Sequence, residues 1–300
     1  MDGEVILQGT RLAEKQFLNF QQVGIVTDHD DAYTVPLVFD YLEGYFAGDV
    51  ISDEIGIFTI NGEDCKKDAF TVFRIRPWID ADTVLKFQKK QLLGLLTEQL
   101  LKTVDKHVVE NIVFSLNSQL LNPIEDFLRP HGLSVYCENL NFSLVSKIID
   151  LRKDDSNGTN VGYTQYQLKV LLLDIISKLK TDTYKLLLWE LPEYGISPSE
   201  FDSLMNQFKL LSADIDNTFI YTKNFDICSY FDNIYSYHLC KRGKIRGMDD
   251  YDEFEQILLD EGIGSNSNSI SSQLIRSLFD KWQFETTYGV VCKELFSDNQ

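Results

Sequence analysis

The sequence predicts an α/β fold in which a mainly parallel sheet carries an inserted helical domain. Short β-branched and aromatic runs occur in two separated parts of the first 240 residues, and about 100 residues between them have the spacing of helices. With 44% hydrophobic and 25% charged residues, the 300-residue chain has the composition of a globular protein of two units.

The first part of the chain reads as strands and turns. The runs 23–27, 55–60 and 70–75 are short and apolar, and Asn61-Gly62 is a hairpin-turn signal. Between the first two runs, 36–46 predicts a helix with Pro36 in its first turn. These elements together predict a βαβ unit.

From Asp80 the pattern becomes helical, with no proline and one glycine in roughly 38 residues. A stripe at spacings of three and four predicts one long helix, whose expected partner is a helix over 163–179. The stripe consists of Leu93, Leu96, Leu100, Val104, Val108 and Ile112. We expect a shorter helix around Ile124, a turn at 130–132 and a mobile tip at 153–162.

Strand signals then return. The continuous apolar run within 184–191 predicts a strand covered on both faces, Ser197 caps a helix that ends near Leu211, and further strands follow at 218–221 and 237–239. The predicted domains are an α/β head (1–79 and 180–247), a helical leg (80–179) and a C-terminal helical extension (248–300). The extension holds an acidic helix at 249–260 and a last helix at 270–282.

Composition bears on location and partners. The longest apolar runs fall short of the roughly 18 residues that a membrane span needs, and Asp2 and Glu4 stand where a secretory signal carries basic residues. We therefore expect a cytoplasmic protein without a membrane partner, whose five scattered cysteines are buried thiols. The net charge of −18 opposes nucleic-acid binding unless basic residues gather on one surface.

Signals for catalysis are weak. Gly243-Lys244 is followed by Ile245, so no phosphate-binding loop for ATP is present. The cluster 28–31 fits either a divalent-cation site or a solvated turn, and we favour the turn. Asp64 and Lys66, with Asp53 or Glu54 upstream, have the spacing of a metal-dependent nuclease, but such spacings arise by chance among 46 carboxylates. We expect no enzyme.

The basic clusters are few and therefore more informative. Each could bind phosphates without reading sequence, or could be an ordinary solvated face. Their members are Lys66 and Lys67, then Lys86, Lys89 and Lys90, then Lys241, Arg242, Lys244 and Arg246.

The order of these pieces resembles the Csn-two family of type II-A CRISPR systems over roughly residues 4–241. The resemblance is clearest in 70–75 leading into the leg, in 110–114 within it, in 185–191, and in 219–224. It implies an α/β head like that of P-loop NTPases without Walker motifs, carrying a long helical leg. It also implies a homotetrameric ring that binds the ends of double-stranded DNA without cleaving them, beside the CRISPR integrase pair and the effector nuclease during spacer acquisition.

The resemblance also implies residue roles. Lys66 and Lys67 fall where the family carries basic residues, and they are the best candidates to line the hole of the ring. Calcium is held by leg carboxylates in short family members; here that loop shrinks to 117–123, which leaves Glu125 and Asp126 as candidate ligands. The last 60 or so residues indicate a long-form subgroup. Two alternatives stay open: a nuclease that uses Asp64 and Lys66, and a protein-interaction scaffold that does not bind DNA.

Overall fold

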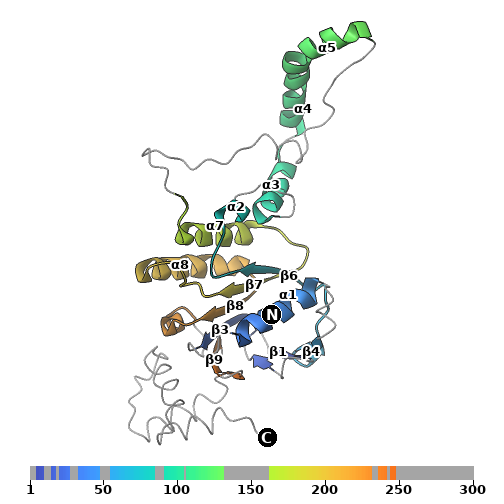
Figure 1. Cartoon of the computed structure of the whole chain (residues 1–300). Coiled ribbons are helices and arrows are strands. Elements are labelled where there is room, and N and C mark those ends of the chain that lie inside the picture. The colour runs from blue at the N-terminus through green and yellow to red at the C-terminus, as the bar shows by residue number, and fades with distance from the viewer. Residues whose placement is uncertain are drawn as a thin grey trace, which may run out of the picture. The chain divides into compact units, whose positions relative to one another are not determined.

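A computed structural model describes residues 5–9, 15–17, 20–27, 33–47, 55–84, 91–104, 106–131, 162–231, 236–241 and 244–247 (Figure 1). The chain divides into two compact units. The first comprises Met1–Ile79, Gln165–Leu173 and Thr181–Gln300, and the second comprises Asp80–Thr164 and Asp174–Lys180. The predicted leg ran without interruption to residue 179, whereas in this division residues 165–173 group with the first unit and 174–180 with the second.

The first unit is built on a six-stranded sheet, which confirms the predicted α/β class. Its strands follow the order β10-β9-β3-β8-β7-β6, and all neighbours are parallel except the β9–β10 pair. The strands are β3 (Gln22–Thr27), β6 (Phe70–Ile75), β7 (Tyr184–Glu190), β8 (Asn217–Thr222), β9 (Tyr237–Lys241) and β10 (Lys244–Gly247). The chain leaves the sheet after β6 and returns at β7, its parallel neighbour.

A second, antiparallel sheet of four strands corrects the predicted βαβ unit. Its order is β2-β1-β4-β5, formed by Lys15–Phe17, Val5–Gly9, Ile55–Ile60 and Glu63–Asp64. The helix α1 (Thr34–Ala47) does follow β3, but β4 pairs with β1 and β5 rather than with β3. The prediction was wrong because an apolar run does not reveal which sheet it joins. The β4–β5 turn holds Asn61 and Gly62 at φ 54° and 78°, as a two-residue hairpin requires.

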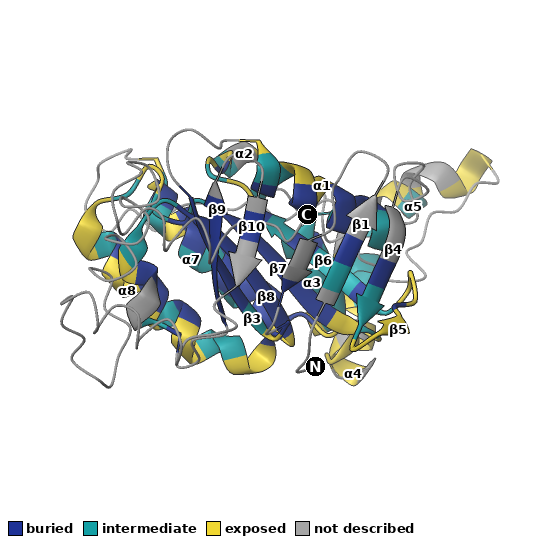
Figure 2. Cartoon of the chain, turned by 90° about the horizontal axis from the view of Figure 1, so that it is seen from below, coloured by how far each residue is buried: buried dark blue, intermediate teal, exposed yellow. Residues whose placement is uncertain are grey.

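The core of this unit lies on both faces of the six-stranded sheet (Figure 2). Leu186 and Leu188 of β7 join the cluster that contains Val38 and Phe39 of α1. The next residue along the strand, Trp189, makes an edge-to-face contact with Phe208 of α8 (Pro198–Leu211), with ring centroids 5.6 Å apart. Since successive side chains of a strand point to opposite faces, α1 and α8 cover opposite faces of β7.

Helix α8 shows how a local signal sets a boundary. The Ser197 side chain accepts the backbone N–H of Glu200, and the Glu200 carboxylate accepts the backbone N–H of Ser197. This reciprocal capping box satisfies two backbone donors at the helix start and holds the pKa of Glu200 below its usual value. The predicted start and end of this helix are confirmed.

The second unit is a series of helices rather than one long helix. Its elements are α2 (Ala81–Val84), α3 (Leu92–Lys102), α4 (Lys106–Ser115), the π-helix η2 (Leu116–Leu121), α5 (Asn122–Leu128) and the 3-10 turn η3 (Arg129–His131). The prediction of a single helix was wrong: α3 ends where the Thr103 hydroxyl bonds to the Leu100 carbonyl, 2.7 Å away. From α4 to η3 the helical chain continues without a gap.

The expected burial of the long stripe is also wrong for four of its six residues. Leu100, Val104, Val108 and Ile112 keep 57%, 40%, 48% and 43% of their surface exposed. The predicted partner helix exists as α7 (Gln165–Lys178), which buries its own apolar residues, among them Leu168, Leu172 and Ile176.

Several predicted elements lie outside the described residues. These are 153–161 of the expected tip, both helices of the extension, and the acidic turn at 28–31. Among the helices that the structure describes, none is long and apolar enough to cross a membrane.

Candidate nucleic-acid interface

Lys66 and Lys67 lie on an exposed loop that is firmly held at its base. The loop joins β5 to β6 beside the hairpin tip, where Figure 2 shows exposed residues. Cys65 donates its backbone N–H to the Phe58 carbonyl at 2.9 Å, and its own carbonyl accepts the Tyr45 hydroxyl. The Cys65 thiol is buried, which raises its pKa to about 11. The base of the loop is therefore fixed, while both lysine side chains face solvent.

The loop carries acidic side chains next to its lysines. Glu63, Asp64 and Asp68 are exposed beside Lys66 and Lys67, so two positive and three negative charges sum to −1. The Lys67 ammonium lies 5.8 Å from the centroid of the Tyr45 ring, within cation–π range. The loop can present two ammonium groups to phosphate, but it is not a cationic patch by itself.

The other predicted basic residues are described only in part. Lys241 is the last residue of β9, and its backbone pairs with Lys244 in β10. Arg246 pairs with Leu239 in the same ladder. Lys86, Lys89, Lys90 and Arg242 lie outside the described residues, as do Asp53 and Glu54 of the nuclease alternative.

Topology keeps the two described basic segments apart. Lys66 and Lys67 precede β6 at one edge of the six-stranded sheet, whereas Lys241 and Lys244 belong to β9 and β10 at the other. Five strand spacings of about 4.8 Å separate β6 from β10, roughly 24 Å across the sheet. Because β6 and β9 run in the same direction, the lysines also sit at opposite ends of the strands: Lys66 and Lys67 before β6 begins, Lys241 where β9 ends. Within one chain, these two basic segments are therefore too far apart to contact the same phosphate group.

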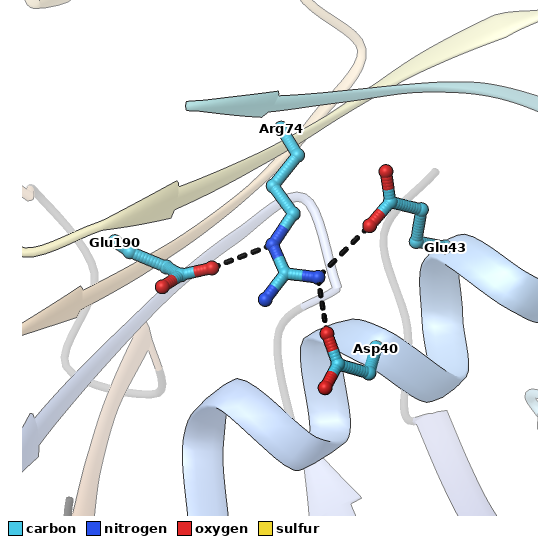
Figure 3. Close-up of polar contacts among 4 residues, drawn as sticks. All are labelled: Asp40, Glu43, Arg74 and Glu190. Carbon is cyan, nitrogen blue, oxygen red and sulfur yellow. Dashed lines mark hydrogen bonds and ion pairs between the residues drawn. The ribbon is translucent and has the colours of Figure 1, made fainter. Parts of the chain in front are cut away.

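The opposite end of β6 holds an ion cluster that the sequence interpretation missed (Figure 3). The Arg74 guanidinium pairs with Glu190 at the end of β7 and with Asp40 and Glu43 on α1. The Arg74 and Glu190 side chains are 6% and 9% exposed, and those of Asp40 and Glu43 are 54% and 44% exposed. Burial alone lowers the pKa of Arg74, but its bonds to Asp40, Glu43 and Glu190 outweigh this and raise it.

This cluster lies at the carboxyl ends of the strands, where open α/β sheets usually bind ligands. The guanidinium and its three carboxylates link α1 to the carboxyl ends of β6 and β7. Side chains of the chain itself therefore pair with one another at this end of the sheet. Two signals pointed to it: an arginine inside the apolar strand 70–75 and a glutamate ending the apolar run 186–189.

A buried lysine fixes the turn that follows β7. The Lys169 ammonium on α7 is fully buried and donates to the carbonyls of Pro192 and Tyr194, at 2.8 and 2.6 Å. Burial lowers its pKa to about 8, although Glu193 acts in the opposite direction. In the same turn, the Glu193 carboxylate accepts the Thr222 hydroxyl and the Lys223 backbone N–H. These contacts tie α7 to the ends of β7 and β8.

The proposed calcium ligands have a different partner. Glu125 and Asp126 lie 3.7 and 3.2 Å from the Arg129 guanidinium on the next turn of helix. Residues 117–123, expected as a loop, are helical in the structure. In the part of the chain that the structure describes, no three His, Cys, Asp or Glu side chains are grouped to hold a metal.

Comparison with known proteins supports the fold. No family model matches the sequence, and no curated protein does. The crystal structure of Stu0660 of Streptococcus thermophilus matches with a TM-score of 0.67 and 15% identity, over 99% of this chain and 94% of that one. The ATP-binding cassette MJ1267 of an ABC transporter, in its ADP conformation, matches with a TM-score of 0.44 and 12% identity, over 88% of this chain and 100% of that one. The chain therefore shares its fold with Stu0660.

Proposed function

We propose that the chain is a non-catalytic protein that binds the ends of double-stranded DNA as a homotetrameric ring and assists the acquisition of new CRISPR spacers. The observation that carries this proposal is the order of the fold. The chain leaves a parallel sheet after β6, forms a helical unit, and returns to the neighbouring strand β7. This is the arrangement that the resemblance to the Csn-two family implies.

The charge distribution of one chain does not favour DNA binding, so the proposal depends on several copies that contact one duplex. The net charge is −18, and the loop with Lys66 and Lys67 has no positive excess. A duplex about 20 Å wide can contact such a loop from several copies at once, so that each copy contributes two ammonium groups to a shared channel. Because Glu63, Asp64 and Asp68 lie in the same loop, the proposal requires the two ammonium groups to lie closer to the phosphates than these carboxylates do.

The test uses the full chain and a fluorescent linear duplex. Binding is measured by anisotropy over a series of salt concentrations for the wild type and for Lys66→Glu/Lys67→Glu. We expect weaker binding and a salt dependence that falls by about one unit of slope for each lysine that contacts phosphate. Lys209→Glu is the matched control, because Lys209 is an exposed lysine of α8 outside the predicted clusters.

The same samples separate the alternatives. If the double variant binds as tightly as the wild type, this loop does not contact DNA. If the wild type does not bind even at low salt, a protein-interaction scaffold replaces the proposal. If DNA is cut in the presence of magnesium or manganese and cutting stops in Asp64→Ala, the protein is a nuclease.

A further inference from the structure

Two large aromatic side chains are exposed where parallel strands of the first unit end. Trp78 follows β6 and is 64% exposed, and Tyr194 follows β7 and is 54% exposed. Because β6 and β7 are neighbours that run in the same direction, the segments after them leave the sheet side by side. Trp78 lies against Gly195, the residue after Tyr194: a Cβ on Gly195 would be 3.5 Å from the Trp78 ring. Trp78 and Tyr194 therefore share one surface, and we call them the aromatic pair.

The turn that carries Tyr194 is strained and is held by buried contacts. Leu191, the first residue after β7, has a φ of 42°, which a bulky side chain rarely permits. Its N–H donates to the Tyr221 carbonyl at 2.7 Å, and the buried Lys169 ammonium donates to the Tyr194 carbonyl at 2.6 Å. Strained backbone persists only where its surroundings fix it, and it clusters at sites that hold ligands. The chain therefore fixes the position of an exposed tyrosine.

Two basic side chains near the aromatic pair have no partner of their own. Arg76 follows β6, and Lys223 follows β8, the neighbour of β7 on its other side. Within the part of the chain that the structure describes, neither the Arg76 guanidinium nor the Lys223 ammonium makes an ion pair or a hydrogen bond. Strands β6 and β8 are two strand spacings apart, about 10 Å. Two positive charges are therefore available close to the aromatic pair.

The nearby carboxylates compete with an anionic ligand to different extents. Glu193 accepts the Lys223 backbone N–H and a threonine hydroxyl, at 2.7 and 2.9 Å. Asp80 accepts a threonine hydroxyl at the start of α2. Asp226 is exposed three residues after Lys223, so Arg76 is the stronger candidate for contact with an anion. The loop before β6 is different, because its exposed carboxylates outnumber its lysines.

Aromatic faces beside unpaired cations match the chemistry of an unpaired nucleotide. A nucleobase stacks on an aromatic ring whatever its sequence, and a nearby cation contacts the phosphate. The site also lies at the carboxyl ends of parallel strands, where open α/β sheets bind their ligands. In a chain with a net charge of −18, an anionic ligand requires such a local supply of free positive charge.

We propose that Trp78, Tyr194 and Arg76 form a binding site for the unpaired nucleotides of single-stranded DNA, with Lys223 as a second phosphate contact. The inference goes beyond the proposed function, because it concerns single strands rather than duplex ends and needs only one chain. Where a duplex end carries an unpaired overhang, the same site holds that overhang.

The test is fluorescence anisotropy of the full chain with a short labelled oligodeoxythymidylate at low salt. The wild type should bind this probe, and Trp78→Ala and Tyr194→Ala should each raise the dissociation constant at least about fivefold because a stacking surface is lost. Trp78→Phe should keep most of the affinity, since phenylalanine retains a ring face. Arg76→Gln should weaken binding and reduce the slope of its salt dependence by about one unit.

Tyr184→Ala is the matched control. Tyr184 is 46% exposed and lies at the opposite, amino end of the same strand β7. Its replacement should change the dissociation constant less than about twofold. A wild type that does not bind the probe, or an effect of Tyr184→Ala as large as that of Trp78→Ala, would overturn the site.

Two further measurements identify the ligand and separate the two proposals. If unlabelled thymidine monophosphate competes as well as the unlabelled oligonucleotide, the site binds a free nucleotide and the assignment to single strands is wrong. The Lys66→Glu/Lys67→Glu variant should bind the probe like the wild type. A protein that binds the probe but no duplex would keep this inference and refute the proposed function, and duplex binding without probe binding would do the reverse.

Discussion

Replacing Arg74 by methionine should destabilise the first unit strongly. Methionine keeps most of the apolar stem but removes the guanidinium, which leaves the Glu190 carboxylate, 9% exposed, buried without a counter-charge. Removing one partner of a buried ion pair costs about 3–5 kcal/mol of unfolding free energy. The pairs with Asp40 and Glu43 add little, because both carboxylates are about half exposed.

The assay is equilibrium unfolding in urea, followed by tryptophan fluorescence, to which Trp189, buried in β7 next to Glu190, contributes. Arg74→Met should lose about 3–5 kcal/mol, and the added change Glu190→Gln should recover about half of it because the buried charge is gone. Asp40→Ala, the control on the exposed side of the cluster, should cost less than about 1 kcal/mol. A loss below about 1 kcal/mol for Arg74→Met, or no recovery with Glu190→Gln, would refute this account of the cluster.

Two further predictions concern the buried core. Burial lowers the pKa of His238 from 6.5 to about 4, so the unfolded chain takes up a proton between these values that the folded chain does not. Wild-type stability should therefore fall by about 3 kcal/mol more than that of His238→Gln between pH 6.5 and pH 4, and parallel pH profiles would contradict this. Gly24→Ala would place its Cβ 2.6 Å from the buried Phe231 ring and should lower the free energy of unfolding by about 1–3 kcal/mol. Thermal unfolding measures this loss, and adding Phe231→Leu should recover part of it. An unchanged melting temperature would show that the ring moves freely.

The sequence predicted the elements whose signals are local. The run 186–189 is apolar at every position because both faces of β7 are covered, and this could be read without knowing the neighbours. The capping box at Ser197 and the Asn61-Gly62 turn are likewise satisfied within four residues. Which sheet a strand joins is not a local property. The runs 55–60 and 70–75 have the same apolar and β-branched composition, yet β4 pairs with β1, which lies about 50 residues before it. The sequence around 55–60 does not indicate so distant a partner.

The candidate site divides in the same way. The sequence identified Lys66 and Lys67 as one of its few basic clusters, and the structure adds that both side chains are exposed. The Arg74 cluster could not be assembled from the sequence, because its partners lie 34, 31 and 116 residues away and meet only through the parallel pairing of β6 with β7. The helical stripe was recognised by its period, but periodicity identifies one face of a helix and does not say what covers it.

The proposed ring is tested most directly by removing the DNA ends. Binding of the full chain is compared between a linear duplex and a covalently closed circle of the same sequence and length, at one salt concentration. The account predicts retention of the linear form and at least tenfold weaker binding of the circle, because a closed ring can take up DNA only over a free end. Equal affinity for the two forms would contradict it.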